Sequence, residues 1–341
     1  MSIPRPGTTH QSTKARLPVL VCALLTLCIP LQDETIAAQA AQGKQQPTQQ
    51  SSQRGDQDYT FRRDVNLVVL HATVLDQQGH FVNDLKQENF RVFEDRVEQK
   101  LSLFRREDIP ITVGLIIDNS ASMRPLRPSV NAAALTFVET SNREDEVFVV
   151  NFNYDYFLDL DKDFTNDVGE LKEALERIDS RGSTALYDAI IGSLDHLKKG
   201  TRDKRVLLVV TDGEDNASRK TLEATIQEAQ QSDALIYSIG LMGEHIKGRS
   251  RRRLQNALRQ LAEATGGLAF FPETVEEAES ICTRIAHDLR NQYTLAYYPT
   301  NTLKDGTFRK VDVEMVSPRG RGKLEVRTRT GYYAKRSTSG N

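Results

Sequence analysis

Apolar and polar positions follow two different periods along the middle of the chain. Short, almost continuous apolar runs are typical of strands buried on both faces of a sheet, and stretches with the 3.6-residue period of amphipathic helices separate them. The runs predict strands at 111–118, 146–152, 205–211, 234–241 and 268–272. The stretches between them predict helices at about 127–141, 168–179, 185–199, 220–232, 252–265 and 275–291. This alternation predicts an α/β domain over 109–291, with a doubly wound, mostly parallel, Rossmann-like sheet.

Both flanks of that domain show the two-residue period of half-buried strands. In the first flank, 58–108, strands are expected around a turn at 76–80 and a turn at Asp95–Arg96, including one strand over 99–104. In the second flank, Asp305–Gly306 favours a hairpin turn. Neither flank is long enough to bury a large core alone. We therefore expect 292–335 to pair with 58–108 in one small β-sandwich-type domain, followed by a tail at 336–341.

The first 57 residues have a different pattern. Residues 17–31 form an apolar run of about fifteen residues after a basic, acid-free start, which is short for a membrane span and suits a signal-peptide core. Ala38–Ala40 supplies a small-x-small cleavage pattern, so 1–40 predicts a signal peptide and an exported protein, in the periplasm, cell envelope or extracellular space of a bacterium. An uncleaved anchor is the alternative, and membrane contact is expected only then. The Gln- and Ser-rich 41–57 predicts a disordered linker.

Charge and cysteine content narrow the function classes. The formal net charge is −2, and the strongest basic run, 247–253, lacks interleaved aromatic residues. We expect it to form a polar loop that opens a helix, and we expect no nucleic-acid partner. Two of the three cysteines lie in the leader, and Cys282 falls in a helical pattern where burial is expected. Neither a disulfide framework nor a zinc-binding spacing is present.

Oxygen-rich side chains occur in three loops of the predicted α/β domain. Asp118, Ser120 and Ser122 follow the strand at 111–118, Thr184 precedes the helix at 185–199, and Asp212 follows the strand at 205–211. Open α/β sheets bind ligands at the carboxyl ends of their strands, so these loops are expected to meet. Each group also has a purely structural interpretation, because the hydroxyls could cap helices and Asp212 could form an ordinary turn.

The donor set of these loops suits a hard divalent cation. It consists of three hydroxyl oxygens and two carboxylates, without histidine or thiolate, which favours Mg²⁺, with Mn²⁺ or Ca²⁺ as alternatives. Neutral hydroxyl ligands leave the cation electrophilic, so a carboxylate from a partner could complete its coordination. The predicted metal-site residues are Asp118, Ser120, Ser122, Thr184 and Asp212.

The same residues resemble the von Willebrand factor type A (VWFA) domain with its metal-ion-dependent adhesion site. The family pattern is D-x-S-x-S, a Thr in a Gly-rich loop and the Asp of a T-D-G turn. The resemblance implies that Ser120, Ser122 and Thr184 bind the ion directly, and that Asp118 and Asp212 hold it through water. One departure is Ser183, where many members have a second glycine. Flanking stretches resemble exported VWFA-related proteins of Acidobacteria and other bacteria, namely 74–79, 89–95, 297–299 and 331–333.

These features lead to one favoured function and two alternatives. We expect a non-enzymatic, exported binding module that grips an acidic side chain of a protein partner through a divalent cation. A metal-dependent hydrolase is the first alternative, with Glu214 or Asp215 as its candidate base. An envelope component whose metal only stabilises the fold is the second. Gly-x-Ser-x-Gly and P-loop motifs are absent from the sequence.

Overall fold

The computed structural model describes residues 67–106, 108–177, 180–243 and 246–336. The predicted signal peptide, the whole predicted linker 41–57, the first residues of the predicted 58–108 module and the last residues of the tail lie outside these ranges. Among the described residues, no helix combines the length and the apolar character that a membrane crossing needs.

The α/β domain is built on a six-stranded sheet with the order β10-β9-β8-β5-β6-β7. Its five parallel strands are β5 (Ile111–Asp118), β6 (Glu146–Phe152), β8 (Lys204–Thr211), β9 (Leu235–Gly240) and β10 (Ala269–Phe270). The edge strand β7 (Tyr156–Leu158) runs antiparallel to β6. Every residue of β5 is buried, as its continuous apolar run requires. The predicted α/β fold with a mostly parallel sheet is therefore confirmed.

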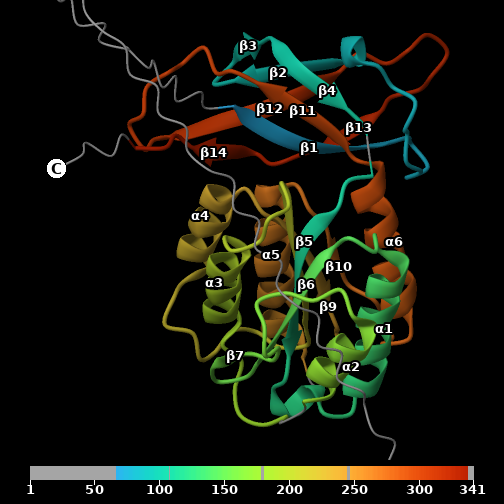
Figure 1. The fold of residues 1–341 in the computed structure, drawn as a ribbon, viewed down its shortest axis with the longest axis vertical. Coiled ribbons are helices and arrows are strands. Elements are labelled where there is room, and N and C mark those ends of the chain that lie inside the picture. The colour runs from blue at the N-terminus through green and yellow to red at the C-terminus, as the bar shows by residue number, and fades with distance from the viewer. Residues whose placement is uncertain (1–66, 107, 178–179, 244–245, 337–341) are drawn as a thin grey trace, which may run out of the picture. The chain divides into compact units, whose positions relative to one another are not determined.

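Helices cover both faces of this sheet (Figure 1). On one face, α1 (Arg127–Thr140), α2 (Val168–Glu176) and α6 (Glu277–Asn291) share a core with every second residue of β5, including Leu115. On the other face, α3 (Leu186–Leu197), α4 (Leu222–Ser232) and α5 (Gly248–Thr265) pack around Ile116 and Phe148. Cys282 is buried in α6, as predicted, and burial raises the pKa of its thiol to about 12.

Two local predictions were wrong. The basic run 247–253 lies almost entirely within α5, because the helix begins at Gly248 and arginine is a good helix former. The single strand expected at 99–104 is two strands, β3 (Val97–Gln99) and β4 (Leu101–Arg105). The chain changes sheets at Lys100, because β3 pairs with β2 (Phe90–Glu94) and β4 pairs with β11 (Tyr293–Tyr297).

The β-rich flanks form two four-stranded sheets with the orders β13-β1-β11-β4 and β14-β12-β2-β3. The remaining strands are β1 (Val68–Leu75), β12 (Phe308–Met315), β13 (Glu325–Arg327) and β14 (Gly331–Tyr333). In the first sheet β11 lies between β1 and β4, and in the second β12 lies between β14 and β2. Apolar side chains from strands of both flanks make one core, hereafter the β-domain core. Each sheet thus combines strands from the two ends of the chain.

A buried polar cluster joins the α/β domain to the β domain. Asp288 of α6 accepts hydrogen bonds from the hydroxyls of Thr73 on β1, at 2.8 Å, and Tyr237 on β9, at 2.7 Å. Gln292 donates to both of these hydroxyl oxygens, at 3.0 and 3.2 Å. Burial raises the pKa of Asp288, although the two hydroxyl donors oppose the shift. Helix α6 is therefore attached to the β domain in two ways. The hydrogen bond from Thr73 to Asp288 links it to β1, and the chain itself runs from α6 directly into β11.

Candidate metal site

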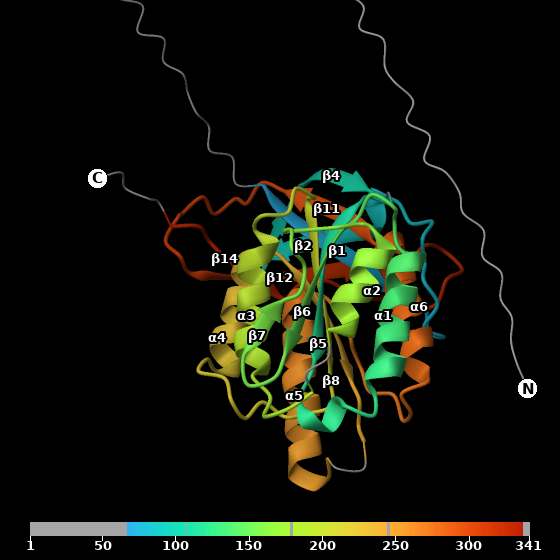
Figure 2. The ribbon, with the colours of Figure 1, turned by 60° about the horizontal axis from the view of Figure 1, so that its bottom comes forward.

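The polar loops predicted from the sequence lie at the carboxyl ends of β5 and β8, the end of the sheet that Figure 2 turns forward. Residues 111–117 of β5 pair in parallel with 204–210 of β8, so the two strands end side by side. Asp118 closes β5 and Asp212 directly follows β8. The sheet therefore brings together two acids that are 94 positions apart in the sequence.

Asp118 is fully buried and held by two donors. Its Oδ2 accepts a hydrogen bond of 2.6 Å from the hydroxyl of Thr211, the last residue of β8. Its Oδ1 accepts a hydrogen bond of 2.7 Å from the backbone N–H of Ser120. The first bond ties β8 to β5, and the second folds the D-x-S turn back over the strand end. The carboxylate orientation is thus set before any ligand is considered.

The two serines of the D-x-S-x-S stretch connect Asp118 to Asp212. The Oγ atoms of Ser120 and Ser122 lie 3.3 Å apart, within hydrogen-bond distance. The Ser122 hydroxyl donates to Asp212 Oδ1 at 2.9 Å. Ser120 is buried and Ser122 is half-buried, so the open side of the group is on the Ser122 side. Hydrogen bonds therefore connect four of the five predicted residues, Asp118 through the Ser120 backbone N–H and the other three through their side-chain oxygens.

Thr184 reaches the same loops through the turn after β8. A Cβ added at Gly213 would lie 3.0 Å from Thr184 Oγ1, so the glycine lets this hydroxyl lie directly against the T-D-G turn. The Thr184 backbone N–H donates to the side-chain oxygen of Asn216 at 2.9 Å. In the preceding loop Gly182 takes the positive φ of 71°, whereas Ser183 does not have a positive φ. The missing second glycine therefore causes no backbone strain at this position.

Ser120 and Thr184 are not helix caps. Ser120 precedes the short 3-10 helix η2 (Ala121–Met123) but makes no side-chain capping bond. The N-cap of α3 is Ala185 rather than Thr184. Because the capping interpretation fails for both residues, their hydroxyls are available to ligands other than the backbone of the next helix.

The site concentrates negative charge in a buried place. Burial raises the pKa of Asp118 to about 6, and the charge of Asp212 adds to this shift, whereas the bonds from Thr211 and Ser120 oppose it. The fully buried Arg127 donates to the Asp118 backbone oxygen at 3.4 Å and to Asn151 Oδ1 at 2.8 Å. Burial lowers the pKa of Arg127 to about 10. A divalent cation among these oxygens would offset the repulsion between the two acids.

The donor chemistry fits such a cation. Two carboxylates and three hydroxyls are oxygen ligands of the type that Mg²⁺ and Ca²⁺ accept. Among the described residues no group of three or more His, Cys, Asp or Glu side chains is arranged to hold a metal ion. The candidate site contains only two such side chains, so it depends on its serine and threonine oxygens.

Two residues that bind Asp118 could not be assigned to the site from the sequence. Thr211 was part of the T-D-G stretch, but its bond to Asp118 depends on the pairing of β5 with β8. Arg127 is the first residue of α1, and its charge predicts an exposed position. It is buried instead, and its guanidinium also donates to the Leu175 carbonyl at 2.8 Å. The role of Thr211 follows from the pairing of β5 with β8, and the role of Arg127 from the packing of α1 beside α2 and β6.

The candidate bases of the hydrolase alternative already have partners. Glu214 forms an ion pair with Arg253 of α5, with 3.2 Å between Oε1 and Nη1. Asp215 accepts hydrogen bonds from the Ser218 hydroxyl and from the backbone N–H of Tyr187. Both acids therefore organise the loop after β8.

The central part of the chain is similar to a known protein family. Residues 113–214 match the von Willebrand factor type A domain. This type A domain match begins in β5 and ends in the loop after β8, so it contains all five candidate metal residues. An uncharacterized protein of Synechocystis sp. is 26% identical over 109 residues, which are 31% of this chain and 26% of that protein. The matched region thus spans about a quarter of that relative.

Several solved structures share similarity with the chain. A von Willebrand factor type A protein from Catenulispora acidiphila is 13% identical, covers 82% of this chain and 76% of its own, and has a TM-score of 0.47. BatB from Bacteroides thetaiotaomicron is 19% identical over 52% of this chain and 98% of its own, with a TM-score of 0.42. A mussel byssus protein with a zinc-occupied MIDAS motif is 16% identical over 57% of this chain and 49% of its own, with a TM-score of 0.46. These values are too low to transfer a ligand or a function.

Proposed function

We propose that this protein is an exported, non-enzymatic binding module that grips an acidic group of a protein partner through a divalent cation, Mg²⁺ first. The observation that carries the proposal is the connected oxygen set at the ends of β5 and β8. It comprises two buried acids and the serine hydroxyls between them, with the Thr184 hydroxyl against the turn that follows Asp212. In this proposal Ser120, Ser122 and Thr184 hold the ion, and Asp118 and Asp212 act through water.

The cation would supply an electrophilic position for a partner's carboxylate. The protein's own residues hold that position at the surface, because Ser122 is half-buried while Asp118 and Asp212 are fully buried. The buried acids orient the hydroxyls and supply negative charge from below. The partner's acid would then complete the coordination from the open side.

The surface beside the site suits contact with a protein. Tyr154 is 50% exposed, and its ring lies against the metal-site loop, 3.1 Å from where a Cβ on Gly182 would be. The Arg181 guanidinium lies over this ring at 5.9 Å from the centroid. Exposed aromatic residues and arginines are enriched at protein interfaces. Export to the periplasm, the envelope or the cell exterior is part of the same proposal and rests on the pattern of residues 1–40.

Affinity capture from envelope extracts tests this function. Immobilised wild-type protein is expected to retain at least one protein in the presence of Mg²⁺ and to release it when EDTA is added. Immobilised Asp118→Ala and the milder variant Ser122→Ala are expected not to retain that protein. The control Asp195→Ala removes an exposed acid of α3 outside the site and is expected to behave as wild type. Retention of the same proteins with EDTA and by both site variants would rule the proposal out.

A further inference from the structure

A cleft of about 1000 Å³ lies between the α/β domain and the β domain. One wall comes from α5, α6 and β10, and the other from the β2–β3 turn, β12 and β13. None of the five candidate metal residues lines it. Its volume is at the upper end of the range of small-molecule sites, which is roughly 300–1,000 Å³. The cleft therefore has room for an organic ligand that is unrelated to the metal site.

Two arginines on the α/β wall present their guanidinium groups to this cleft. Arg259 of α5 lies over the ring of Phe271, at 4.8 Å from its centroid, and Arg284 of α6 lies over Phe270, at 5.8 Å. Both arginines are exposed, and within the described ranges neither of them makes an ion pair. A guanidinium stacked on a ring keeps its N–H donors at its edge, where they can bind a carboxylate or a phosphate in bidentate fashion.

The acids that line the cleft compensate this positive charge only in part. Glu325 is paired with Arg327 at 2.8 Å, and Asp312 with Lys310 at 3.0 Å. Glu314 lies 3.7 Å from Arg91, whose guanidinium is already bound by Glu98 through two hydrogen bonds of 2.9 Å. Glu263 makes no ion pair within the described structure. Arg96, Arg259 and Arg284 therefore outnumber the acids that lack a cationic partner of their own, and the cleft favours an anion.

Arg96, on the opposite wall, is held in an unfavourable backbone conformation. It is the second residue of the two-residue turn between β2 and β3, where φ is +47° at Asp95 and +71° at Arg96. Such turns favour glycine at the second position, because a left-handed backbone conformation is unfavourable for a residue with a Cβ atom. Nothing in the turn itself requires an arginine there.

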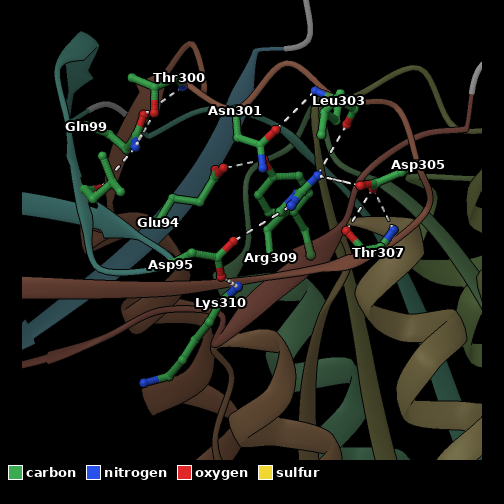
Figure 3. Close-up of polar contacts among 12 residues, drawn as sticks. Glu94, Asp95, Gln99, Thr300, Asn301, Leu303, Asp305, Thr307, Arg309 and Lys310 are labelled. Atoms are coloured by element: carbon green, nitrogen blue, oxygen red, sulfur yellow. Dashed lines mark hydrogen bonds and ion pairs between the residues drawn. The ribbon is translucent and has the colours of Figure 1, made fainter.

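The turn is anchored through Asp95, not Arg96. Asp95 Oδ1 accepts a 2.9 Å hydrogen bond from the backbone N–H of Lys310, and its other oxygen lies 3.9 Å from Arg309 Nη1 (Figure 3). Arg309 in turn donates to Asp305 at 3.1 Å, which fixes the guanidinium between the two acids. The β domain thus keeps the turn in shape and displays Arg96 at the cleft despite its strained backbone. Strain of this kind is typical of functional positions.

We propose that this cleft binds a small organic anion that carries at least two carboxylate or phosphate groups. Arg259 and Arg284 bind anionic groups of the ligand from the α/β wall, and Arg96 binds from the β-domain wall. Apolar lining residues, Phe93, Leu268 and Val313 among them, contact the part of the ligand between its anionic groups. This site goes beyond the proposed metal-dependent function and does not depend on it.

Calorimetric titration of the full-length protein tests this site. Citrate probes for carboxylate binding and pyrophosphate for phosphate binding, in buffer free of divalent cations so that chelation at the metal site does not contribute. We expect saturable binding of at least one probe, and a roughly tenfold or larger loss of affinity in the double variant Arg259→Gln/Arg284→Gln, because charge-assisted hydrogen bonds are removed. Arg251→Gln makes the same change at an exposed position of α5 outside the cleft and is expected to bind as wild type.

Arg96→Gly separates binding from folding. Glycine relieves the left-handed backbone, so this variant is expected to melt at or above the wild-type temperature while its affinity for the same probe falls. Absence of saturable binding of both probes to the wild type would overturn the proposal. Equal affinity in wild type and the double variant would overturn it as well, and unchanged affinity in Arg96→Gly would remove the β-domain wall from the site.

Discussion

Asp118 and Asp212 are both fully buried, and hydrogen bonds through Ser120 and Ser122 connect them. Two acids in such a place repel each other, and burial adds a desolvation cost that raises the pKa of Asp118. Thr211 and the Ser120 backbone N–H stabilise the charged form of Asp118, and Arg127 places a positive charge below it. These partners limit the repulsion, and a divalent cation would remove more of it.

The candidate site could be predicted from the sequence only in part. Its five oxygen-bearing residues lie in short motifs that can be found in the sequence. In the structure the loops that carry these motifs contact one another. Their role as ligands stays a prediction. Arg127 and Thr211 could not be identified in advance, because their contacts with Asp118 arise from strand pairing and from the packing of α1 against α2.

Asp145 gives a pH prediction away from the metal site. It is buried, accepts hydrogen bonds from Ile111 N–H at 2.8 Å and Asn142 N–H at 3.1 Å, and burial raises its pKa to about 6. The folded state then binds this proton more tightly than the unfolded state, whose Asp pKa is about 3.9. Stability contributed by Asp145 is therefore present at low pH and is lost as the pH rises from about 4 through 6.

Asp145→Asn removes this titration. The free energy of unfolding of the wild type, relative to that of Asp145→Asn, is expected to fall between pH 4 and pH 7 by at most about 3 kcal/mol, which is two pKa units of differential protonation. Urea unfolding of both proteins at intervals of one pH unit measures the difference. A difference that is constant, or that grows as the pH rises, would contradict the assigned environment of Asp145.

At the scale of elements, long apolar runs were predicted well and short strands were not. The strands β5, β6 and β8 coincide with their predicted ranges to within one residue, because each is a continuous apolar stretch. β10 contains only two residues, but it falls within the strand predicted at 268–272. The three-residue β3 and β14 are too short for a period to show. They belong to a sheet assembled from both flanks of the α/β domain, which local pattern does not encode.

Gly114 in the middle of β5 tests the packing of the central strand. A Cβ at this position would lie 2.4 Å from Phe148 Cζ and 2.8 Å from Leu207 Cδ2, so both neighbours must move. Gly114→Ala is expected to lower the free energy of unfolding by about 1–3 kcal/mol, as overpacking of a filled core does. Chemical denaturation measures the loss, with Ser102→Ala on an exposed position of β4 as the control. A variant as stable as the wild type would show that this core is looser than the structure indicates.

At the scale of the whole molecule, the α/β domain and the β domain are joined in two ways. The chain enters the α/β domain from β4 and leaves it through α6 into β11, so the two connections lie on neighbouring strands of one sheet. The Asp288 cluster adds hydrogen bonds between α6, β9 and β1. The β flanks are therefore attached to the helix that closes the α/β fold, and the two are expected to unfold together.

Asp288→Ala breaks this joint. It leaves the Thr73 and Tyr237 hydroxyls without their acceptor, at a cost of about 1–3 kcal/mol for each buried group. We expect a lower melting temperature and a broader transition that separates the two domains in calorimetry, while Asp195→Ala melts as the wild type does. A single, equally cooperative transition at the wild-type temperature would show that the cluster does not couple the domains.

The central claim, that the loops after β5 and β8 bind a divalent cation, is tested most directly by calorimetric titration of Mg²⁺ into the full-length protein. One saturable site is expected in the wild type and in Asp195→Ala. Asp118→Ala and Ser122→Ala are expected to weaken Mg²⁺ binding about 10–100-fold, as loss of a group that holds or orients metal ligands does. Thermal melts in EDTA establish that both variants are folded. Wild-type protein without a saturable Mg²⁺ site, or with one that Asp118→Ala and Ser122→Ala leave unchanged, would contradict the claim.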